Sequence, residues 1–311
     1  MRLLPLAALP ALLAVALAVP GPAPAQRPAE AAGDPMIVAA GDIACDPNNS
    51  AYNGGNGTGQ LCQHRAVSDV IARLAPTAVL PLGDEQYADG RLSAFQTSYA
   101  SSWGRFLPVT RPVPGNHEYG VAGASGYFDY FGSRAGPRGK GYYSYNLGTW
   151  HLIALNGNCG AVGGCGVGSP QEVWLRRDLA ANPRRCTLAY WHQARFSSGP
   201  HGDNSTYTAI WNALYRANAD VVLAGHDHHY ERFAPMRGDG TLDHVRGIRS
   251  FVVGTGGSQH YAISRVRANS QARNTTSFGA LQLALRDGYY GWQFHPAAGG
   301  TYTDGSITRC H

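Results

Sequence analysis

The sequence predicts a layered α/β domain with helices on the outside, and three observations lead to this prediction. Short apolar runs of β-type residues alternate with amphipathic helical patterns along most of the chain. Two longer segments alternate apolar and polar residues around a turn, which is typical of β-hairpins. The 40 glycines and 19 prolines among 311 residues favour many loops over long helices. No repeat and no change of composition follows residue 36, so we expect one domain over residues 36–311.

Five short apolar runs predict buried strands because of their length, their β-branched residues and the glycines beside them. Each run ends in a polar residue. The runs are MIVAAGD to Asp42, TAVLPLGD to Asp84, TRPVPGNH to His117, CTLAYWH to His192 and DVVLAGHDH to His228. RSFVVGTGG (249–257) predicts a further buried strand, and residues 141–156 and 279–296 predict hairpins.

Three segments predict amphipathic helices between these strands. Residues 64–74 and 207–218 each place apolar side chains on one helical stripe. In the third segment Ser169 is the expected N-cap, Pro170 the first helical residue and Glu172 the acidic partner of a capping box.

The N-terminal segment predicts a secretory signal peptide over residues 1–25. It has one basic residue, Arg2, then an apolar core, and it ends in Ala-Pro-Ala at positions 23–25. The mature chain would begin near Gln26 with a flexible leader over residues 26–35. An uncleaved membrane anchor is the alternative, but the apolar core is short for a span and contains two prolines. We therefore expect a secreted or extracytoplasmic protein with no stable membrane span after cleavage.

Six cysteines in an exported chain are expected to form disulfides, because the extracytoplasmic space is oxidising. Proximity in the sequence favours Cys45 with Cys62 and Cys159 with Cys165, which leaves Cys186 for Cys310. Other pairings remain open at this point. The chain has no Cys-x-x-Cys motif, which disfavours a thiolate zinc cluster.

The formal net charge of +5 is spread along the chain. The sequence contains no dense Lys/Arg run, basic helix or zinc-finger spacing of the kind that nucleic-acid binding requires. Nucleic acid is therefore expected only as a possible diester substrate.

Side chains of metal-binding types follow the predicted strands. In open α/β sheets, ligands bind at the carboxyl ends of the strands, where side chains can converge. The residues at these positions are Asp42, Asp84, Asn116, His117, His192, His226 and His228. Carboxylate, amide and imidazole donors together suit iron, manganese or zinc rather than copper(I).

The spacing of these residues is compatible with two adjacent metal ions. Two neighbouring cations need a shared carboxylate, and Asp84 in GDEQY is the expected bridge. Tyr87 follows three residues later and can bind iron(III) as a phenolate, because a cation favours the deprotonated ligand. On an extended chain His226 and His228 point the same way, so each can address one ion.

Each motif alone has a structural alternative. Gly-Asp is a common turn, GNHE can also form a turn, and His192 alone fits a buried core histidine. GHDHHYER favours a metal by itself, because burying so much charge without a partner is costly. The ordered set of five motifs, each after an apolar run, favours a metal site over these alternatives.

Taken together, these motifs resemble those of the calcineurin-like metallophosphoesterases, and within them the purple acid phosphatases. The resemblance covers essentially all of residues 36–311 and implies a four-layer αββα sandwich of mixed sheets with helices outside. The wider family usually has a histidine where this chain has Ala44. Tyr87 takes that vacant place, which is the pattern of the purple acid phosphatase branch.

The resemblance implies two metal ions and assigns ligands to each. The first ion, expected to be iron(III), would be held by Asp42, Asp84, Tyr87 and His228. The second, expected to be iron(II), zinc or manganese, would be held by Asp84, Asn116, His192 and His226.

The resemblance also implies two catalytic histidines. His117 would reach toward the phosphate as an outer-sphere donor, and His201 falls where plant members carry a pair of substrate histidines. Gly202 replaces the second of that pair, so the chain departs from the family pattern in the residues that bear on the acid pH optimum and the leaving-group proton donor. The first motif closely follows the leader, so the chain resembles a compact secreted bacterial type without the N-terminal β-sandwich of the plant enzymes.

The expected function is hydrolysis of small phosphate monoesters by attack of metal-activated hydroxide at phosphorus. A phosphodiesterase or nucleotidase that uses the same ions is the first alternative. An exported metal- or phosphate-binding protein without turnover is the second, and the complete set of ligands disfavours it.

Overall fold

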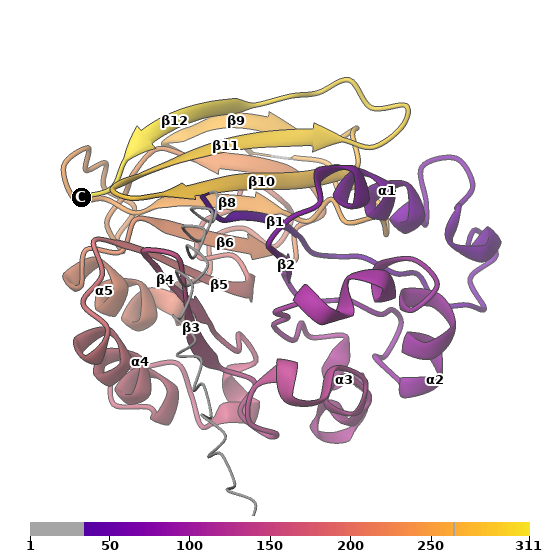
Figure 1. Ribbon diagram of the computed structural model, residues 1–311, viewed down its shortest axis with the longest axis horizontal. Coiled ribbons are helices and arrows are strands. Elements are labelled where there is room, and N and C mark those ends of the chain that lie inside the picture. The colour runs from indigo at the N-terminus through magenta and orange to yellow at the C-terminus, as the bar shows by residue number, and fades with distance from the viewer. Residues whose placement is uncertain (1–33, 264) are drawn as a thin grey trace, which may run out of the picture. The chain divides into compact units, whose positions relative to one another are not determined.

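The computed structural model describes residues 34–263 and 265–311, which form two β-sheets with helices around them (Figure 1). The predicted signal peptide, residues 1–25, and residues 26–33 of the predicted leader lie outside this described part. One sheet has five strands in the order β12-β11-β10-β1-β2, and the other has seven in the order β3-β4-β5-β6-β8-β7-β9.

The elements have the following bounds. The strands are β1 (Met36–Ala40), β2 (Ala78–Pro81), β3 (Tyr143–Leu147), β4 (Trp150–Ala154), β5 (Cys186–Gln193), β6 (Val221–Gly225), β7 (Tyr230–Phe233), β8 (Arg249–Val253), β9 (Ser270–Asn274), β10 (Gly279–Arg286), β11 (Tyr289–Pro296) and β12 (Gly305–Arg309). The helices are α1 (His64–Leu74), α2 (Leu92–Ala94), α3 (Ser125–Phe131), α4 (Pro170–Ala181) and α5 (Thr208–Arg216), with short 3₁₀ and π turns between them.

Helices cover the outer faces of both sheets. α1 packs on β10 and β11 of the five-stranded sheet, whereas α4 and α5 pack side by side against the seven-stranded sheet (Figure 1). Strand β6 shows how the layers form, because successive side chains of a strand point to opposite faces. Val221 and Leu223 belong to the core shared by both sheets, and Val222 and Ala224 belong to the core under α4 and α5. The predicted four-layer αββα sandwich is confirmed.

Parallel pairs in both sheets bring the predicted strand ends together. β1 pairs in parallel with β2, and β5 pairs in parallel with β4 and β6. One predicted strand, 110–117, is wrong. Thr110 makes an isolated bridge to Val79, and the residues after it run as an irregular connection. Pro112 and Pro114 explain the difference, because neither has an N–H to donate to a ladder.

The predicted hairpins and helices form, with one difference in detail. β3 pairs with β4 and β10 with β11, both antiparallel. Ser169 is the N-cap of α4 and Pro170 its first residue, as predicted. The Glu172 carboxylate accepts from the Gly168 N–H at 3.0 Å, one residue before the N-cap, so the expected capping box is not formed.

The structure confirms the three disulfides expected from the sequence, which are Cys45–Cys62, Cys159–Cys165 and Cys186–Cys310. The third connects β5 of the seven-stranded sheet to the residue after β12 of the five-stranded sheet. It therefore ties the two sheets together at the C-terminal end of the chain.

Beside this third disulfide lies the buried carboxylate of Asp220. It accepts hydrogen bonds from the Thr187 N–H at 2.8 Å and from the His311 N–H at 2.9 Å. Burial outweighs these donors and raises the pKa of Asp220 to about 6 from an ordinary value of 3.8. The folded chain therefore binds this proton more tightly than the unfolded chain does.

We expect Asp220→Asn to gain stability relative to the wild type as the pH rises from about 4 to about 6. Below this window the carboxyl group is protonated in both the folded and the unfolded chain, so there is no buried charge to destabilise the fold. Above it the ionised group costs the fold about 3 kcal/mol, which the neutral amide avoids. Denaturant unfolding of both proteins at pH 4, 5, 6 and 7 measures the difference, with exposed Asp287→Asn as control. A difference that does not change with pH would contradict the assignment.

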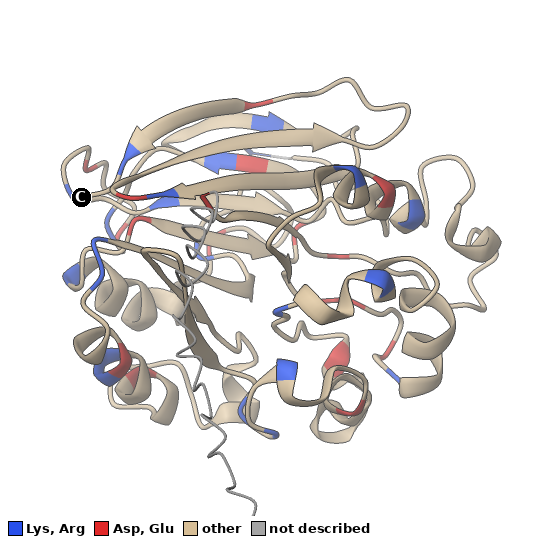
Figure 2. Ribbon diagram, in the orientation of Figure 1, with Lys and Arg blue, Asp and Glu red and all other residues tan. Residues whose placement is uncertain are grey.

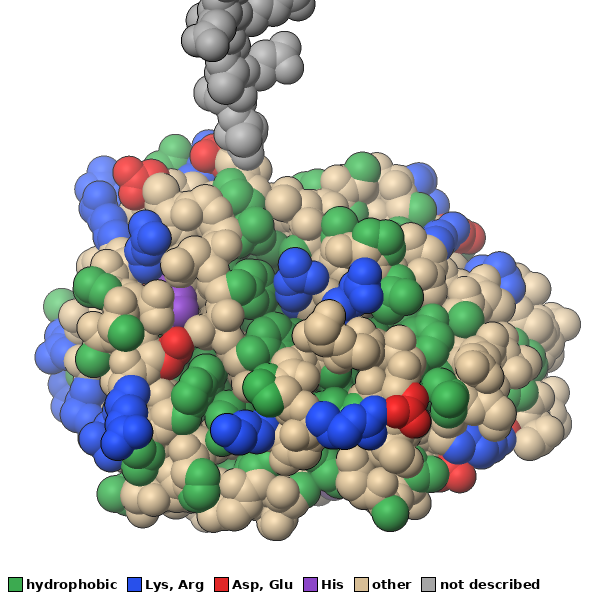
Figure 3. Space-filling model, turned by 60° about the horizontal axis from the view of Figure 1, so that its bottom comes forward, with side chains coloured by type: hydrophobic (Ala, Val, Ile, Leu, Met, Phe, Trp, Pro, Cys, Tyr) green, Lys and Arg blue, Asp and Glu red, His purple; other side chains and the backbone are tan. Residues whose placement is uncertain are grey.

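Charged side chains are distributed over the described surface. Figure 2 shows Lys and Arg on several helices and strands, with Asp and Glu interspersed among them. On the face shown in Figure 3, basic side chains form separate groups between hydrophobic and uncharged ones. Among the described residues, none of the helices is both long enough and apolar enough to cross a membrane.

Candidate metal centre

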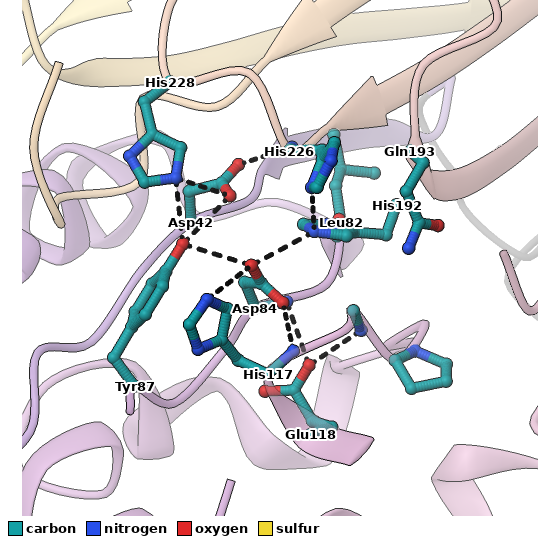
Figure 4. Close-up of polar contacts among 12 residues, drawn as sticks. Asp42, Leu82, Asp84, Tyr87, His117, Glu118, His192, Gln193, His226 and His228 are labelled. Carbon is teal, nitrogen blue, oxygen red and sulfur yellow. Dashed lines mark hydrogen bonds and ion pairs between the residues drawn. The ribbon is translucent and has the colours of Figure 1, made fainter. Parts of the chain in front are cut away.

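Four strand ends place ligand-type side chains around one point (Figure 4). Asp42 follows β1, Asp84 follows β2, His192 lies near the end of β5, and His226 follows β6. Asp42, Asp84 and His226 all have left-handed backbone conformations, with φ of 62°, 48° and 72°. Such φ values are uncommon outside glycine and are typical of functional sites that the surrounding structure holds in place.

Glycine is required next to these turns because the two sheets approach closely there. A Cβ atom at Gly83, where φ is +82°, would lie 2.6 Å from the ring of His192. A Cβ atom at Gly225 would lie 2.7 Å from Oδ2 of Asp42. The Gly-Asp and Gly-His pairs of the sequence thus reflect this contact between the ends of the strands.

The first group of side chains surrounds the hydroxyl of Tyr87. Its oxygen lies 3.1 Å from Asp42 Oδ1, 3.2 Å from Asp84 Oδ2 and 3.0 Å from His228 Nε2. His228 Nε2 is also 3.2 Å from Asp42 Oδ1. A phenol carries one proton and can donate to one of these acceptors. A cation among the four groups would instead be bound by all of them.

The second group is built on His192. Its Nδ1–H donates to the Leu82 carbonyl at 2.8 Å, which leaves Nε2 facing the centre. Nε2 lies 3.2 Å from Asp84 Oδ2 and 3.2 Å from Nδ1 of His226. Asp84, His192 and His226 therefore form a compact triad of potential ligands. Asp84 Oδ2 belongs to both groups, which is the position expected of a bridge.

The electrostatics of the centre favour positive charge. Burial would lower the pKa of His192, but the carboxylates of Asp84 and Asp42 raise it to about 9. Burial would raise the pKa of Asp84, yet the neighbouring His192 and His117 lower it below its ordinary value. Burial, then the charges of His192 and His201, lower the pKa of His226 to about 4, so His226 is a neutral donor at physiological pH. The residues present fit a site for cations.

Asn116 is the predicted ligand that the structure does not bring into this set of contacts. It lies at an exposed turn directly before His117. Its side chain makes no hydrogen bond to the centre within the described parts of the chain, so its role as a ligand stays a prediction. The backbone N–H of His117 does reach the centre, donating to Asp84 Oδ1 at 2.9 Å.

The two predicted catalytic histidines lie beside the centre. His117 Nε2 is 3.8 Å from Asp84 Oδ2, its Nδ1 bonds to the Ala88 carbonyl, and the side chain is 35% exposed. The ring of His201 lies 4.0 Å from that of His226, and its Nδ1 lies 2.7 Å from Asp227 Oδ1. In both histidines the hydrogen bond to the neighbouring residue is made by Nδ1, and Nε2 is not used in it.

Position 202, where the plant enzymes carry the second substrate histidine, does not open onto empty space. A Cβ atom there would lie 2.8 Å from the guanidinium of Arg267. Arg267 itself is held by a bond of 3.2 Å from Nε to the Ser197 carbonyl. A histidine at position 202 would therefore require Arg267 to move.

Sequence reasoning missed three residues around the centre. Glu118 accepts from the backbone N–H groups of Asp84, Gly115 and Gln86, at 3.0, 2.7 and 3.1 Å. Tyr261 stacks on His228 with 3.9 Å between ring centroids, and Asp227 orients His201. Glu118 and Asp227 lie inside the recognised motifs and could have been found there. No pattern in the sequence indicates Tyr261.

Comparison with known proteins agrees with this geometry. The sequence matches the calcineurin-like phosphoesterase family over residues 36–230. An uncharacterized protein of Mycobacterium tuberculosis is 29% identical over 285 aligned residues, which cover 73% of this chain and 53% of that protein. Purple acid phosphatase 15 of Arabidopsis thaliana is 30% identical over 205 residues, covering 53% of this chain and 38% of that protein.

The fold has a counterpart among solved structures. Purple acid phosphatase PPD1 from yellow lupin seeds superposes with a TM-score of 0.66 at 19% identity, over 88% of this chain and 53% of that one. The chain spans about half the length of the curated relatives it matches, or less. The family match extends from the first residue of β1 to residue 230, within the GHDHHYER motif, and includes every predicted ligand. The chain therefore belongs to the calcineurin-like phosphoesterase family, and within it resembles the purple acid phosphatase branch.

Proposed function

We propose that this chain is an exported dinuclear metallophosphoesterase that hydrolyses phosphate monoesters. The observation that carries the proposal is the position of Asp84 Oδ2, which lies 3.2 Å from both Tyr87 Oη and His192 Nε2. A carboxylate oxygen between two groups of ligands is what two adjacent cations require.

The donor types favour a different ion in each group. Asp42, Asp84, Tyr87 and His228 would hold iron(III), and Asp84, Asn116, His192 and His226 would hold iron(II), zinc or manganese. Phenolate and carboxylate are hard anionic donors that suit a trivalent ion, whereas imidazoles suit a divalent one. Such ions, when bound, lower the pKa of water and withdraw charge from phosphoryl oxygens.

The phenol of Tyr87 provides a spectroscopic test of the first ion. We expect the iron-loaded wild type to absorb visible light, because a phenolate bound to iron(III) gives a charge-transfer band. Tyr87→Phe should lose this band while keeping some hydrolysis, since Asp42, Asp84 and His228 remain. Tyr261→Phe is the matched control and should stay coloured. A colourless wild type after mild oxidation would contradict iron(III) and leave a zinc or manganese pair.

The two histidines would bind the phosphate and supply a proton to the leaving alkoxide. His117 in its protonated form can donate Nε2–H to a phosphoryl oxygen. Asp227 holds the Nδ1 side of His201, so His201 in its protonated form could donate from Nε2 to the departing oxygen. Asp227 is itself fixed by the Ser197 hydroxyl, which donates to its other oxygen.

A pair of substrates tests the proton-donor role of His201. We expect His201→Asn to slow an alkyl phosphate by about 100-fold, because an alkoxide needs a proton as it leaves. Hydrolysis of p-nitrophenyl phosphate should fall by less than about tenfold, since nitrophenolate is stable without a proton. Equal losses on both substrates would show that His201 binds phosphate instead.

Parallel hydrolysis assays test the proposed function itself. Initial rates on a phosphate monoester and the matching diester are measured across pH, with iron, zinc and manganese supplied in turn. We expect the higher kcat/KM on the monoester. A diester preference would make the chain a phosphodiesterase, and no turnover of either would favour a binding protein without catalysis.

Export and processing belong to the same proposal. Cleavage near Gln26 would leave a short leader to residue 35 and a catalytic domain over 36–311. The three disulfides support an oxidising compartment.

A further inference from the structure

A cavity of about 290 Å³ opens beside the candidate metal centre. It shares two residues with that centre, Tyr87 and His117, which form one of its walls. The rest is lined by Ala88, by the loop that the Cys45–Cys62 disulfide closes, and by Ser258, Gln259 and Tyr261. Its volume is at the small end of the range for ligand pockets. A group bound here would adjoin a phosphate held at the centre.

The walls of the cavity are fixed before any ligand arrives. The Cys62 N–H donates to the Ser258 carbonyl at 2.8 Å, which joins the disulfide loop to the segment after β8. Tyr261 is held by its stacking on His228 and by its N–H, which donates to the His228 carbonyl at 2.9 Å. A pocket of fixed shape binds a fitting ligand more tightly than a flexible one, because less conformational freedom is lost on binding.

The charge of the cavity wall comes from Asp46. Its carboxylate pairs with Arg91 at 2.7 Å, and Arg91 also pairs with Asp89 at 2.9 Å. Arg91 is shared between two carboxylates, so its single positive charge does not fully offset the negative charge of Asp46. Among the described residues that line the cavity, none is Lys or Arg. Apart from His117, whose proposed role is to bind the phosphate, no described lining residue would compensate an anionic group on the alcohol portion of a ligand.

We propose that this cavity receives the alcohol portion of the phosphate ester, and that it selects small polar alcohols that are neutral or carry an amine. This inference rests on the proposed phosphoesterase function and adds the substrate class to it. Asn49 and Gln259 in the wall offer side-chain amides to hydroxyl groups. Asp46 repels carboxylate-bearing alcohols and attracts ammonium groups.

Three small esters whose alcohols differ in charge test this on the wild-type full chain. They are sn-glycerol 3-phosphate, phosphoethanolamine and 3-phosphoglycerate, whose alcohols are neutral, cationic and anionic. We expect kcat/KM for 3-phosphoglycerate to be about tenfold below that for glycerol phosphate, as one uncompensated charge predicts. Phosphoethanolamine should equal or exceed glycerol phosphate. If 3-phosphoglycerate is cleaved as well as the other two, the proposed subsite is wrong.

The Asp46→Asn variant tests whether Asp46 causes the selectivity against anionic alcohols. The ratio of kcat/KM for 3-phosphoglycerate to that for glycerol phosphate should rise by about fivefold or more, because the negative charge of the wall is removed. Asp129→Asn, an exposed aspartate on α3 that pairs with Arg138, should leave the ratio unchanged. An unchanged ratio in Asp46→Asn overturns the role of Asp46. Failure of all three esters in the wild type would instead count against the phosphoesterase function.

Discussion

Asp84→Asn is expected to lower kcat/KM for a phosphate monoester by about a thousandfold. The amide is nearly isosteric, and its oxygen can still accept the His117 N–H that now binds Asp84 Oδ1 at 2.9 Å. What is lost is the second carboxylate oxygen, which lies 3.2 Å from both Tyr87 Oη and His192 Nε2. A neutral amide cannot offset the repulsion of two cations, and losing their joint action costs about 4 kcal/mol of transition-state stabilisation.

The assay for this variant is steady-state hydrolysis at saturating metal. Asp89→Asn is the matched control, because Asp89 lies five residues later and pairs with Arg91 instead. Asp89→Asn should keep turnover close to that of the wild type. If metal-replete Asp84→Asn keeps more than about a tenth of the wild-type activity, Asp84 is not the bridge.

Glu118→Leu is expected to destabilise the fold by about 4 kcal/mol. The buried carboxylate accepts three backbone N–H groups, and two of them belong to the loop that carries Asp84. Each buried N–H left without an acceptor costs about 1 to 3 kcal/mol. Glu118→Gln keeps one carbonyl oxygen and should lose about half as much stability.

Glu85 provides the control for this prediction. It is as deeply buried as Glu118, but among the described residues no backbone N–H of another residue donates to its carboxyl oxygens. Burial, then the charge of Glu118, raises its pKa well above the ordinary value. Glu85→Leu should therefore be neutral or stabilising. Chemical denaturation compares the variants, and an equal loss from Glu85→Leu and Glu118→Leu would mean that packing, not hydrogen bonding, decides the effect.

The parts of the structure that the sequence could predict are those with local signals. Apolar runs followed by Gly-Asp or Gly-His marked the ends of β1, β2 and β6. Parallel pairing places the ends of β1 and β2 side by side in one sheet and those of β5 and β6 side by side in the other. Two of the three disulfides are the pairs that proximity in the sequence predicted, and the third joins the two cysteines that were left. The helix at 64–74 has the predicted bounds because its apolar stripe faces the shared core.

The parts that could not be predicted depend on contacts between distant segments. Arg267 faces Gly202 across 65 positions of sequence, and nothing near Gly202 indicates it. Tyr261 rather than its neighbour His260 reaches the centre, because His260 stacks on Phe278 at 3.9 Å. The expected strand at 110–117 failed for a local reason, since its prolines interrupt the ladder of donors.

The number of metal ions bound per chain tests the central claim most directly. The purified full chain is loaded with iron and zinc, freed of loosely bound ions and examined by elemental analysis, alongside Asp84→Asn. The account predicts two ions per wild-type chain and at most one in the variant. A wild type that retains one ion or none would contradict a dinuclear centre.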